Sequence, residues 1–558
     1  MKLPIGISDF KELIEEKYDF ADKTLFVKEI MGDGAKVILI TRPRRFGKTL
    51  NMSMLQYFLQ SNYPQEQNLF EGLAVSEDVE FCKTYQNQYP IIFISFKDIK
   101  KSNFVDAYAD ITKLIKKLYA SHEYLLEGDI LPEHEKHTFI SLLNQDGIKT
   151  DVEGAIEQLS AYMTKKFNQK PILLIDEYDT PIQAAYMNGY YDEMIELMRS
   201  IMGQALKDNI HITKAILTGI TRVAQESLFS GVNNFIAYSL LQKKYGQYFG
   251  FTEAEVIGLL NKSEYVIPLQ GIKEWYNGYR VGDYTLYNPW SIINCLNNEG
   301  ILKPYWLNTA DNSLLKSLVS NASTVVKRRF EELLQGKSVE APLMENLVFA
   351  DLNQKEDVLW SFLLYVGYLN VLSTRRQGYL LLAEIAIPNK EVGCIYDEMI
   401  SEWFSKAISL ETYDEFVNSI STGDMERFEV ILSAYLIQSG SYFDFNVNTP
   451  EQVFHGFILG LVLGLRDSYI IKSNQEGGYG RFDVVLIPND KKKNGVLIEF
   501  KTADRAELLE SRAKEALEQI KLKKYTAIFE QHGIKSALAI GLAFCGKQVR
   551  MSYENIRT

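Results

Sequence analysis

The sequence contains few cysteines and no long apolar run. Its four cysteines among 558 residues lie far apart without a Cys-x-x-Cys pair, which argues against a disulfide framework or a zinc site and fits a reducing cytoplasm. The longest apolar stretch, Phe457–Leu465, is interrupted by glycine and is far shorter than the roughly 20 residues that cross a bilayer. The N-terminus lacks the charged and then apolar pattern of a secretory signal. We therefore expect a cytoplasmic protein without a membrane partner.

An excess of basic residues is also lacking. The chain has 60 Lys and Arg against 72 Asp and Glu, a net charge of −12, which argues against a protein that simply coats nucleic acid. Residues 441–558 contain 17 Lys and Arg and 14 Asp and Glu, so the first 440 residues carry −15. This asymmetry favours the C-terminal segment as the contact for a polyanion, and chance scatter of surface charge is the alternative explanation.

The first part of the chain has the pattern of a parallel sheet. The length predicts about three or four domains of ordinary globular composition. Over roughly the first 250 residues, strand-like apolar runs alternate with helical segments, which is typical of parallel strands joined by crossover helices. The expected strands are Lys36–Thr41, Tyr89–Ser95, Pro171–Ile175 and Ile212–Thr218, and the expected helices are Lys48–Gln60, Ala107–Leu118, Val152–Phe167 and Asp192–Gln204.

The remainder of the chain predicts a helical region and then a second α/β pattern. Residues from Phe251 to about Ser320 have a helical, aromatic-rich pattern. Glu356–Tyr368 follows as a helix, with a hairpin formed by Leu369–Ser373 and Tyr379–Ile387, a combination compatible with a winged-helix element. The other expected elements are the helices Asp414–Gln438, Pro450–Leu465 and Arg505–Lys523 and the strands Arg481–Ile487, Val496–Lys501 and Ser536–Ala543.

A phosphate-binding loop is predicted where the first strand meets its helix. The run Arg42–Thr49 reads RPRRFGKT and approximates the pattern G-x-x-x-x-G-K-[ST] between a strand and a helix. Backbone N–H groups at a helix N-terminus favour an anion, Lys48 is expected to reach the β- and γ-phosphates, and the Thr49 hydroxyl is expected to bind Mg²⁺. Arg42 stands in the place of the first glycine, so a differently bent loop is the alternative. The residues assigned to nucleotide binding here are Arg44, Arg45, Phe46, Gly47, Lys48 and Thr49.

Two acids end the apolar strand of the run Pro171–Glu177. Buried parallel strands present functional residues at their carboxyl ends. We expect Asp176 to support the Mg²⁺ shell and Glu177 to orient and polarise the attacking water, the alternative being a solvated surface turn. The next strand ends at Thr218, which is expected to sense the γ-phosphate unless its hydroxyl only caps the strand. ATP and Mg²⁺ are thus the predicted cofactors.

A second group of charged residues lies in the predicted hairpin of the C-terminal segment. If Leu486 faces Val496, Asp483 falls opposite Glu499. Lys501 shares a strand face with Glu499 because side chains two apart point the same way. Two carboxylates beside a lysine suit a Mg²⁺-dependent phosphodiesterase, in which the acids hold the cation and the lysine positions or deprotonates water. An accidental arrangement in an exposed hairpin is the alternative.

The chain contains the runs RPRRFGKT, LLIDEYD, TGITRVAQESLFSGVNN, WYNGYRVGDYTLYNPWSI and YWLNTADNSLL. These runs resemble bacterial AAA-ATPase-like proteins that carry a C-terminal nuclease-like domain of the PD-(D/E)xK superfamily. The resemblance covers roughly residues 3–320 and 440–550, and that family's loop tolerates an arginine at position 42. It implies a P-loop ATPase core and a helical acid, Glu451, as a further ligand of metal or water. Gln519 and Tyr525 resemble a Gln…Tyr signature of some of these nucleases.

We therefore predict an α/β protein in four parts. Residues 1–250 form a P-loop AAA-like ATPase domain with a parallel sheet, 251–320 its helical lid, 321–440 a helical linker region with the winged-helix pattern, and 441–558 a restriction-endonuclease-like α/β domain. The predicted function is ATP binding and hydrolysis coupled to Mg²⁺-dependent phosphodiester cleavage of nucleic acid, DNA rather than RNA. The alternative is an ATP-gated switch or nucleic-acid-binding module that does not cut, and homo-oligomer formation is left open. The predicted catalytic residues are Glu177, Lys501 and Glu451, and the predicted metal ligands are Thr49, Asp176, Asp483 and Glu499.

Overall fold

The computed structural model divides the chain into two compact units. The first comprises Met1–Leu315 and Glu340–Val392, and the second comprises Lys316–Val339 and Gly393–Thr558. The four predicted domains remain a prediction. The structure describes residues 1–61, 69–144, 147–222, 228–229, 235–306, 315, 318, 324–334, 336–347, 349–352, 355–396, 410–438, 451–462, 465, 468–477, 480–523 and 527–557.

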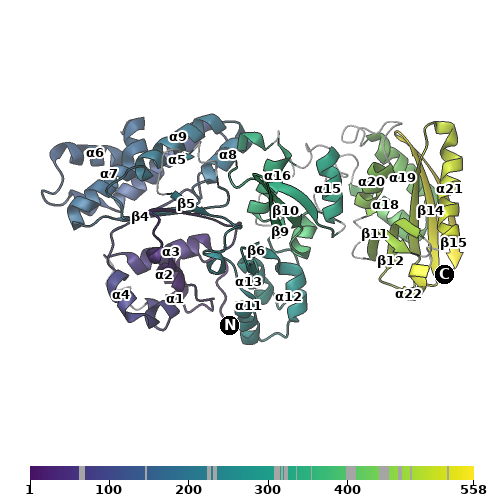
Figure 1. Cartoon of the computed structure of the whole chain (residues 1–558), viewed down its shortest axis with the longest axis horizontal. Coiled ribbons are helices and arrows are strands. Elements are labelled where there is room, and N and C mark those ends of the chain that lie inside the picture. Colours follow the sequence, from purple (N-terminus) through teal and green to yellow (C-terminus); the bar gives the residue numbers. More distant parts are fainter. Residues whose placement is uncertain are drawn as a thin grey trace. The chain divides into compact units, whose positions relative to one another are not determined.

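A parallel sheet forms the centre of the first unit. Its strands are β1 (Val37–Thr41), β2 (Ile91–Ser95), β3 (Ile172–Asp176), β4 (Lys214–Gly219) and β5 (Phe235–Tyr238), in the order β2-β3-β4-β1-β5. The helices before and between them are α1 (Phe10–Glu15), α2 (Leu25–Gly32), α3 (Lys48–Leu59), α4 (Val79–Tyr85), α5 (Phe104–Ala120), α6 (Glu133–Asn144), α7 (Lys149–Phe167), α8 (Thr180–Asn188) and α9 (Tyr191–Leu206). Figure 1 shows α3 on one side of the sheet and α5, α7 and α9 on the other. β1 and β3 are buried along their whole length because helices cover both faces.

The predicted strands and crossover helices of this sheet are confirmed, with their ends displaced by a few residues. β4 lies between β1 and β3, so the carboxyl ends of these three strands meet at one edge of the sheet. β5 was not predicted. It is a short edge strand whose residues are only partly buried, so its apolar signal is weak.

The rest of the first unit contains helices and two smaller sheets. Its helices are α11 (Glu253–Lys262), α12 (Leu269–Tyr276), α13 (Pro289–Asn297) and α16 (Glu356–Val366). The strands β6 (Tyr279–Val281) and β7 (Tyr284–Leu286) pair with each other, and β8 (Val339–Leu343), β9 (Asn370–Gln377) and β10 (Leu380–Ala386) form a sheet of order β8-β10-β9. The predicted helix before the hairpin is therefore present as α16, and the hairpin as β9 and β10.

The β6–β7 hairpin corrects the prediction of an all-helical stretch after residue 250. Gly278 and Gly282 have φ of +102° and +55°, conformations that interrupt a helix and that glycine adopts without strain. The tyrosine, valine and threonine residues between and after them favour extended backbone. The helical pattern of the surrounding aromatic residues masked this short signal.

A mixed sheet of order β11-β12-β13-β14-β15 forms the core of the second unit. Its strands are β11 (Tyr469–Gly477), β12 (Gly480–Pro488), β13 (Gly495–Thr502), β14 (Ser536–Cys545) and β15 (Gln548–Arg557), and its helices are α15 (Thr324–Leu334), α18 (Leu410–Thr422), α19 (Met425–Gln438), α20 (Glu451–Val462), α21 (Leu509–Leu522) and α22 (Ala527–His532). β13 pairs with β14 in parallel, and the other neighbours are antiparallel. Buried residues of α18, α19 and α20 pack on one face, and those of α21 and α22 on the other (Figure 1).

The second unit tests two of the predictions, the register of the β12–β13 hairpin and the extent of one helix. Leu486 lies opposite Val496, which confirms the predicted register of the β12–β13 hairpin. The single helix predicted over Asp414–Gln438 is instead two helices, α18 and α19, because Gly423 has a left-handed φ of +79° between them. None of the described helices combines the length and the apolar character that a membrane crossing requires.

Candidate functional site

The predicted phosphate-binding loop connects β1 to the N-terminus of α3, which begins at Lys48. Gly47 caps this helix with φ of +80°, and Arg45 also has a left-handed φ of +68°. Glycine takes this conformation without strain, whereas Arg45 is held there with its guanidinium 4.1 Å from the ring centre of Trp290. The loop thus turns sharply into a helix N-terminus, where backbone N–H groups bind anions.

Arg42, which stands in place of the first glycine, is a structural residue. Its guanidinium is fully buried and donates to the carbonyl oxygens of Thr41 and Tyr238 at 2.8 and 3.0 Å. Burial lowers the pKa of Arg42 to about 9, so the side chain stays charged at neutral pH. Because Tyr238 lies on β5, Arg42 ties the start of the loop to the neighbouring strand rather than to a ligand.

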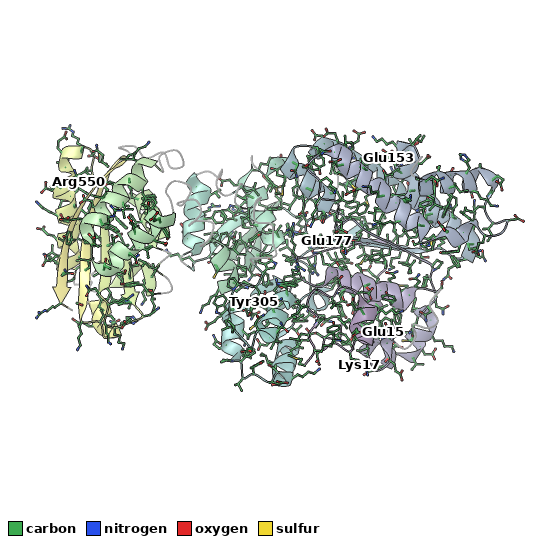
Figure 2. The ribbon with its side chains drawn as sticks, turned by 180° about the vertical axis from the view of Figure 1, so that it is seen from behind. Glu15, Lys17, Glu153, Glu177, Tyr305 and Arg550 are labelled. Carbon is green, nitrogen blue, oxygen red and sulfur yellow. The ribbon has the colours of Figure 1, made fainter. Side chains whose placement is uncertain are left out.

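Four predicted site residues converge beside this loop. Lys48 is buried, and its Nζ lies 3.2 Å from Glu177 Oε1 and donates to two loop carbonyl oxygens at 3.2 Å each. Thr49 Oγ1 donates to Asp176 Oδ2 at 2.8 Å. Glu177 has φ of +53°, a conformation that is uncommon outside glycine and that clusters at functional sites. Figure 2 shows Glu177 at the end of the central sheet.

Asp176 accepts hydrogen bonds from three hydroxyl groups, those of Thr49, Thr218 and, at 3.3 Å, Ser95 at the end of β2. Thr218 Oγ1, at the end of β4, donates to Asp176 Oδ1 at 2.6 Å, opposite the contact from Thr49. Burial and the nearby charge of Glu177 raise the pKa of Asp176, while the bonds from Thr218 and Thr49 oppose this. Thr218 therefore contacts the acid behind the loop, and its role as a sensor of the γ-phosphate stays a prediction.

The loop borders a cavity of about 370 Å³, a volume typical of small-molecule sites. Its lining combines cationic, acidic and apolar side chains, including Arg44, Lys48, Thr49, Lys97, Lys100, Glu177, Phe251, Trp290 and Ile293. Arg44, Arg45, Phe46 and Gly47 also line it, so the whole predicted nucleotide-binding run reaches this space. The residues fit a nucleotide with Mg²⁺, because cations and backbone N–H groups suit phosphates and the oxygens of Thr49 and Asp176 suit a hard cation.

Asp179, the third acid of the run LLIDEYD, is fully buried, and its role is not predicted from the sequence. One of its oxygens, Oδ2, accepts from the backbone N–H groups of Ile220 and Thr221 at 3.0 and 2.8 Å and from the Thr221 hydroxyl at 2.8 Å. Gln183 Nε2 also donates to it at 2.8 Å, and Gln183 Oε1 accepts from Arg44 at 3.4 Å. Asp179 thus holds the segment that follows Thr218 and connects it to the phosphate-binding loop.

Asp179→Asn is expected to lower the rate of ATP hydrolysis about 10- to 100-fold with little change in ATP affinity. An amide keeps one acceptor oxygen but loses the charge, and its NH2 group replaces one of the two oxygens that the Ile220 N–H contacts at 3.3 and 3.0 Å. The segment after Thr218 therefore shifts while the phosphate contacts stay. Single-turnover hydrolysis and calorimetric binding measure the two effects separately. Exposed Glu193→Gln on α9 is the matched control, and an Asp179→Asn rate equal to that of the control would contradict this role.

The C-terminal acids converge where the β12–β13 ladder opens. Asp483 Oδ2 accepts from the backbone N–H of Phe500 at 2.8 Å, next to Glu499. Burial raises the pKa of Asp483, and the Phe500 N–H and the Lys501 charge oppose this. Ile498 and Phe500, on the alternate positions of β13, pack in the core.

Glu499 is almost fully buried, and Gln519 on α21 donates a hydrogen bond to its Oε1. This contact depends on the close packing of α21 against β14. A Cβ at Gly541 would lie 2.2 Å from Ala513 O and 2.5 Å from Leu517 N, so only glycine permits this approach. The structure thus brings Gln519, one of the two residues that resemble the Gln…Tyr signature, to the predicted metal ligand Glu499.

Other predicted residues of this site are placed only in part. Glu451 begins α20, but its side chain lies outside the described residues, and so does Tyr525. Among the residues that the structure describes, no three His, Cys, Asp or Glu side chains are grouped as a metal site. Asp483 and Glu499 still fit Mg²⁺, which commonly takes one or two carboxylates and completes its shell with water and substrate oxygens.

Known proteins resemble this chain at three levels. A solved Walker-type ATPase of Pyrococcus abyssi is 12% identical with a TM-score of 0.35, covering 71% of this chain and 98% of that one. An uncharacterized protein in the vnfD 5′ region of Azotobacter chroococcum mcd 1 is 23% identical over 542 residues, which cover 95% of this chain and 94% of that protein. Residues 4–229 match the family of predicted AAA-ATPases, and residues 449–554 match the PD-(D/E)XK nuclease superfamily. The chain therefore combines an N-terminal segment like predicted AAA-ATPases with a C-terminal segment like PD-(D/E)XK nucleases.

Proposed function

We propose that the first unit binds and hydrolyses ATP in the cavity beside the phosphate-binding loop. The observation that carries this proposal is the convergence of Lys48, Thr49, Asp176 and Glu177 at the edge where β1 and β3 end. Lys48 binds the β- and γ-phosphates, and Thr49 with Asp176 holds Mg²⁺, which neutralises phosphate charge when bound. Glu177 orients the attacking water, and Asp179 is a positioning residue for the segment after Thr218.

We propose further that the second unit cleaves phosphodiester bonds of nucleic acid, DNA rather than RNA. Asp483 and Glu499 hold Mg²⁺ there, and the neighbouring Lys501 positions or deprotonates water. Gln519 fixes the orientation of Glu499 through its hydrogen bond. ATP binding or hydrolysis controls access of the nucleic acid to this site, in a cytoplasmic protein able to form homo-oligomers.

A binding module that does not cut is the second candidate function. Both acids accept hydrogen bonds inside the protein, Asp483 from Phe500 N–H and Glu499 from Gln519, so part of their capacity for a cation is already used. In that case ATP gates nucleic-acid binding alone. A wild-type protein that binds nucleic acid but cuts neither DNA nor RNA with Mg²⁺ or Mn²⁺ favours this candidate.

Glu177→Gln tests the hydrolytic part of the proposal. The amide keeps the shape of the side chain but cannot polarise water, so ATP hydrolysis should fall roughly 100-fold or more while ATP affinity is at least that of the wild type. Phosphate release and calorimetry measure the two quantities. The control is Glu193→Gln, an exposed acid of α9. Wild-type hydrolysis by Glu177→Gln would exclude Glu177 as the water-orienting residue.

A further inference from the structure

The hairpin formed by β9 and β10 exposes nine consecutive residues, 372–380. The two strands pair from Asn370–Ala386 to Gln377–Leu380, and Gly378 turns the chain with φ of +61°. Tyr379 at the turn is 91% exposed, and Leu372 is 43% exposed. Both faces of the outer hairpin therefore reach solvent.

The exposed part of this hairpin is basic in an otherwise acidic chain. Residues 372–380 contain Arg375 and Arg376 and no acid, whereas the whole chain has a net charge of −12. The exposed acid of the same hairpin, Glu384, lies opposite Ser373 and accepts from its hydroxyl at 3.1 Å. Arg375 makes two hydrogen bonds to the Glu340 carboxylate, at 2.8 and 2.9 Å. No carboxylate among the described residues forms an ion pair with Arg376, so its charge faces water.

The base of the hairpin is held firmly to the rest of the first unit. Arg280, the middle residue of β6, donates to the carbonyl oxygen of Leu372, and its backbone N–H donates to Asn370 Oδ1 at 2.9 Å. Val371 and Ala383 are buried beneath the exposed part. A rigid base with an exposed basic end presents its side chains at fixed positions, which lowers the entropy lost on binding a partner.

We propose that the β9–β10 hairpin binds duplex DNA, with Arg376 and Tyr379 contacting the backbone at the groove that the hairpin enters. The major groove is wide enough for a two-stranded β-ribbon, and guanidinium groups suit phosphate oxygens. Polar side chains beside Arg376, such as Thr374 and Gln377, add the hydroxyl and amide groups that often contact phosphates. This inference rests on the proposed nucleic-acid function and adds a DNA contact separate from Asp483 and Glu499.

The test measures the affinity of the full-length protein for a short DNA duplex over a range of salt concentrations, without divalent metal so that no strand is cut. Arg376→Ala should weaken DNA binding about three- to tenfold. It should also make the negative slope of log affinity against log salt shallower by about 0.9, the value for one lost phosphate contact. Arg376→Lys should keep the salt slope of the wild type because it keeps the charge. Tyr379→Ala should weaken DNA binding and leave the salt slope unchanged, because tyrosine carries no charge. Lys207→Ala, an exposed cation at the end of α9, is the matched control.

Each outcome decides between the hairpin and its alternatives. If the wild type binds DNA and Arg376→Ala shows the affinity and slope of Lys207→Ala, the hairpin proposal is overturned while the proposed nucleic-acid function stands. If the wild type binds neither DNA nor RNA and cuts neither, the proposed function of the second unit fails, and an acidic protein surface becomes the partner that this hairpin fits. Thermal unfolding and ATP hydrolysis at wild-type levels show that Arg376→Ala is folded.

Discussion

Lys48→Ala is expected to abolish ATP binding, with an affinity loss of at least about 100-fold. Lys48 is the buried cation at the start of α3, and its ammonium group is the principal positive charge available to the β- and γ-phosphates. Arg44 and Lys100 also line the cavity, but Lys100 is exposed and therefore contributes less in water. Calorimetric titration of purified protein with ATP and Mg²⁺ measures the loss directly.

The fold of the variant must be checked because Lys48 donates to carbonyl oxygens of its own loop. A Lys48→Ala protein with wild-type circular dichroism and DNA affinity but no ATP binding supports the assignment. Lys207→Ala removes an exposed cation at the C-terminal end of α9 that does not line the cavity, so this variant should bind ATP like the wild type. Retention of wild-type ATP affinity by Lys48→Ala would show that the phosphates bind elsewhere.

Removal of either C-terminal acid is expected to eliminate metal-dependent cleavage. Asp483→Ala and Glu499→Ala each take a carboxylate from a cation that needs several oxygen ligands, so cleavage should fall at least about 1,000-fold. Lys501→Ala should lose most of the rate, about 100-fold or more, and keep metal affinity because the lysine acts on water. Gel assays of DNA cut with Mg²⁺ or Mn²⁺, with and without ATP, report all three variants.

Nucleic-acid binding distinguishes lost chemistry from a lost fold. The three variants should still bind DNA, and the two acid variants should bind at least as tightly because negative charge is removed near the phosphates. Glu507→Ala, an exposed acid just before α21, is the matched control and should cut like the wild type. Cleavage that persists in both Asp483→Ala and Glu499→Ala would refute this site while leaving the enzyme class open.

The sequence predicts the elements with strong periodicity and misses those whose signal is short. β1 and β3 are uniformly apolar because both faces are covered, and the motifs at their ends could be found from spacing alone. β5, β6 and β7 have three or four residues each, too few for a clear alternation. The break between α18 and α19 depends on one backbone angle at Gly423, which no apolar pattern reveals.

The candidate sites divide in the same way. The strand register that brings Asp483 to Glu499 follows from local pairing and was predictable. The role of Asp179 could not be predicted, because its partners Ile220 and Thr221 lie some 40 residues further along the chain, just after β4. A signal was present, since a third acid in LLIDEYD falls just before a helix, but its contacts depend on the order of strands in the sheet.

The ion pair between Lys48 and Glu177 has a consequence for the order of events at this site. Its ammonium and carboxylate groups lie 3.2 Å apart, so Glu177 and the phosphates of ATP compete for one cation. When the phosphates of ATP draw Lys48 toward them, the Glu177 carboxylate is released and can act on water. ATP binding and the release of Glu177 are therefore thermodynamically coupled. Glu177→Gln removes the carboxylate that competes with the phosphates for Lys48. The binding free energy of ATP should therefore become more favourable by the amount that the Lys48–Glu177 ion pair contributes in the nucleotide-free wild type.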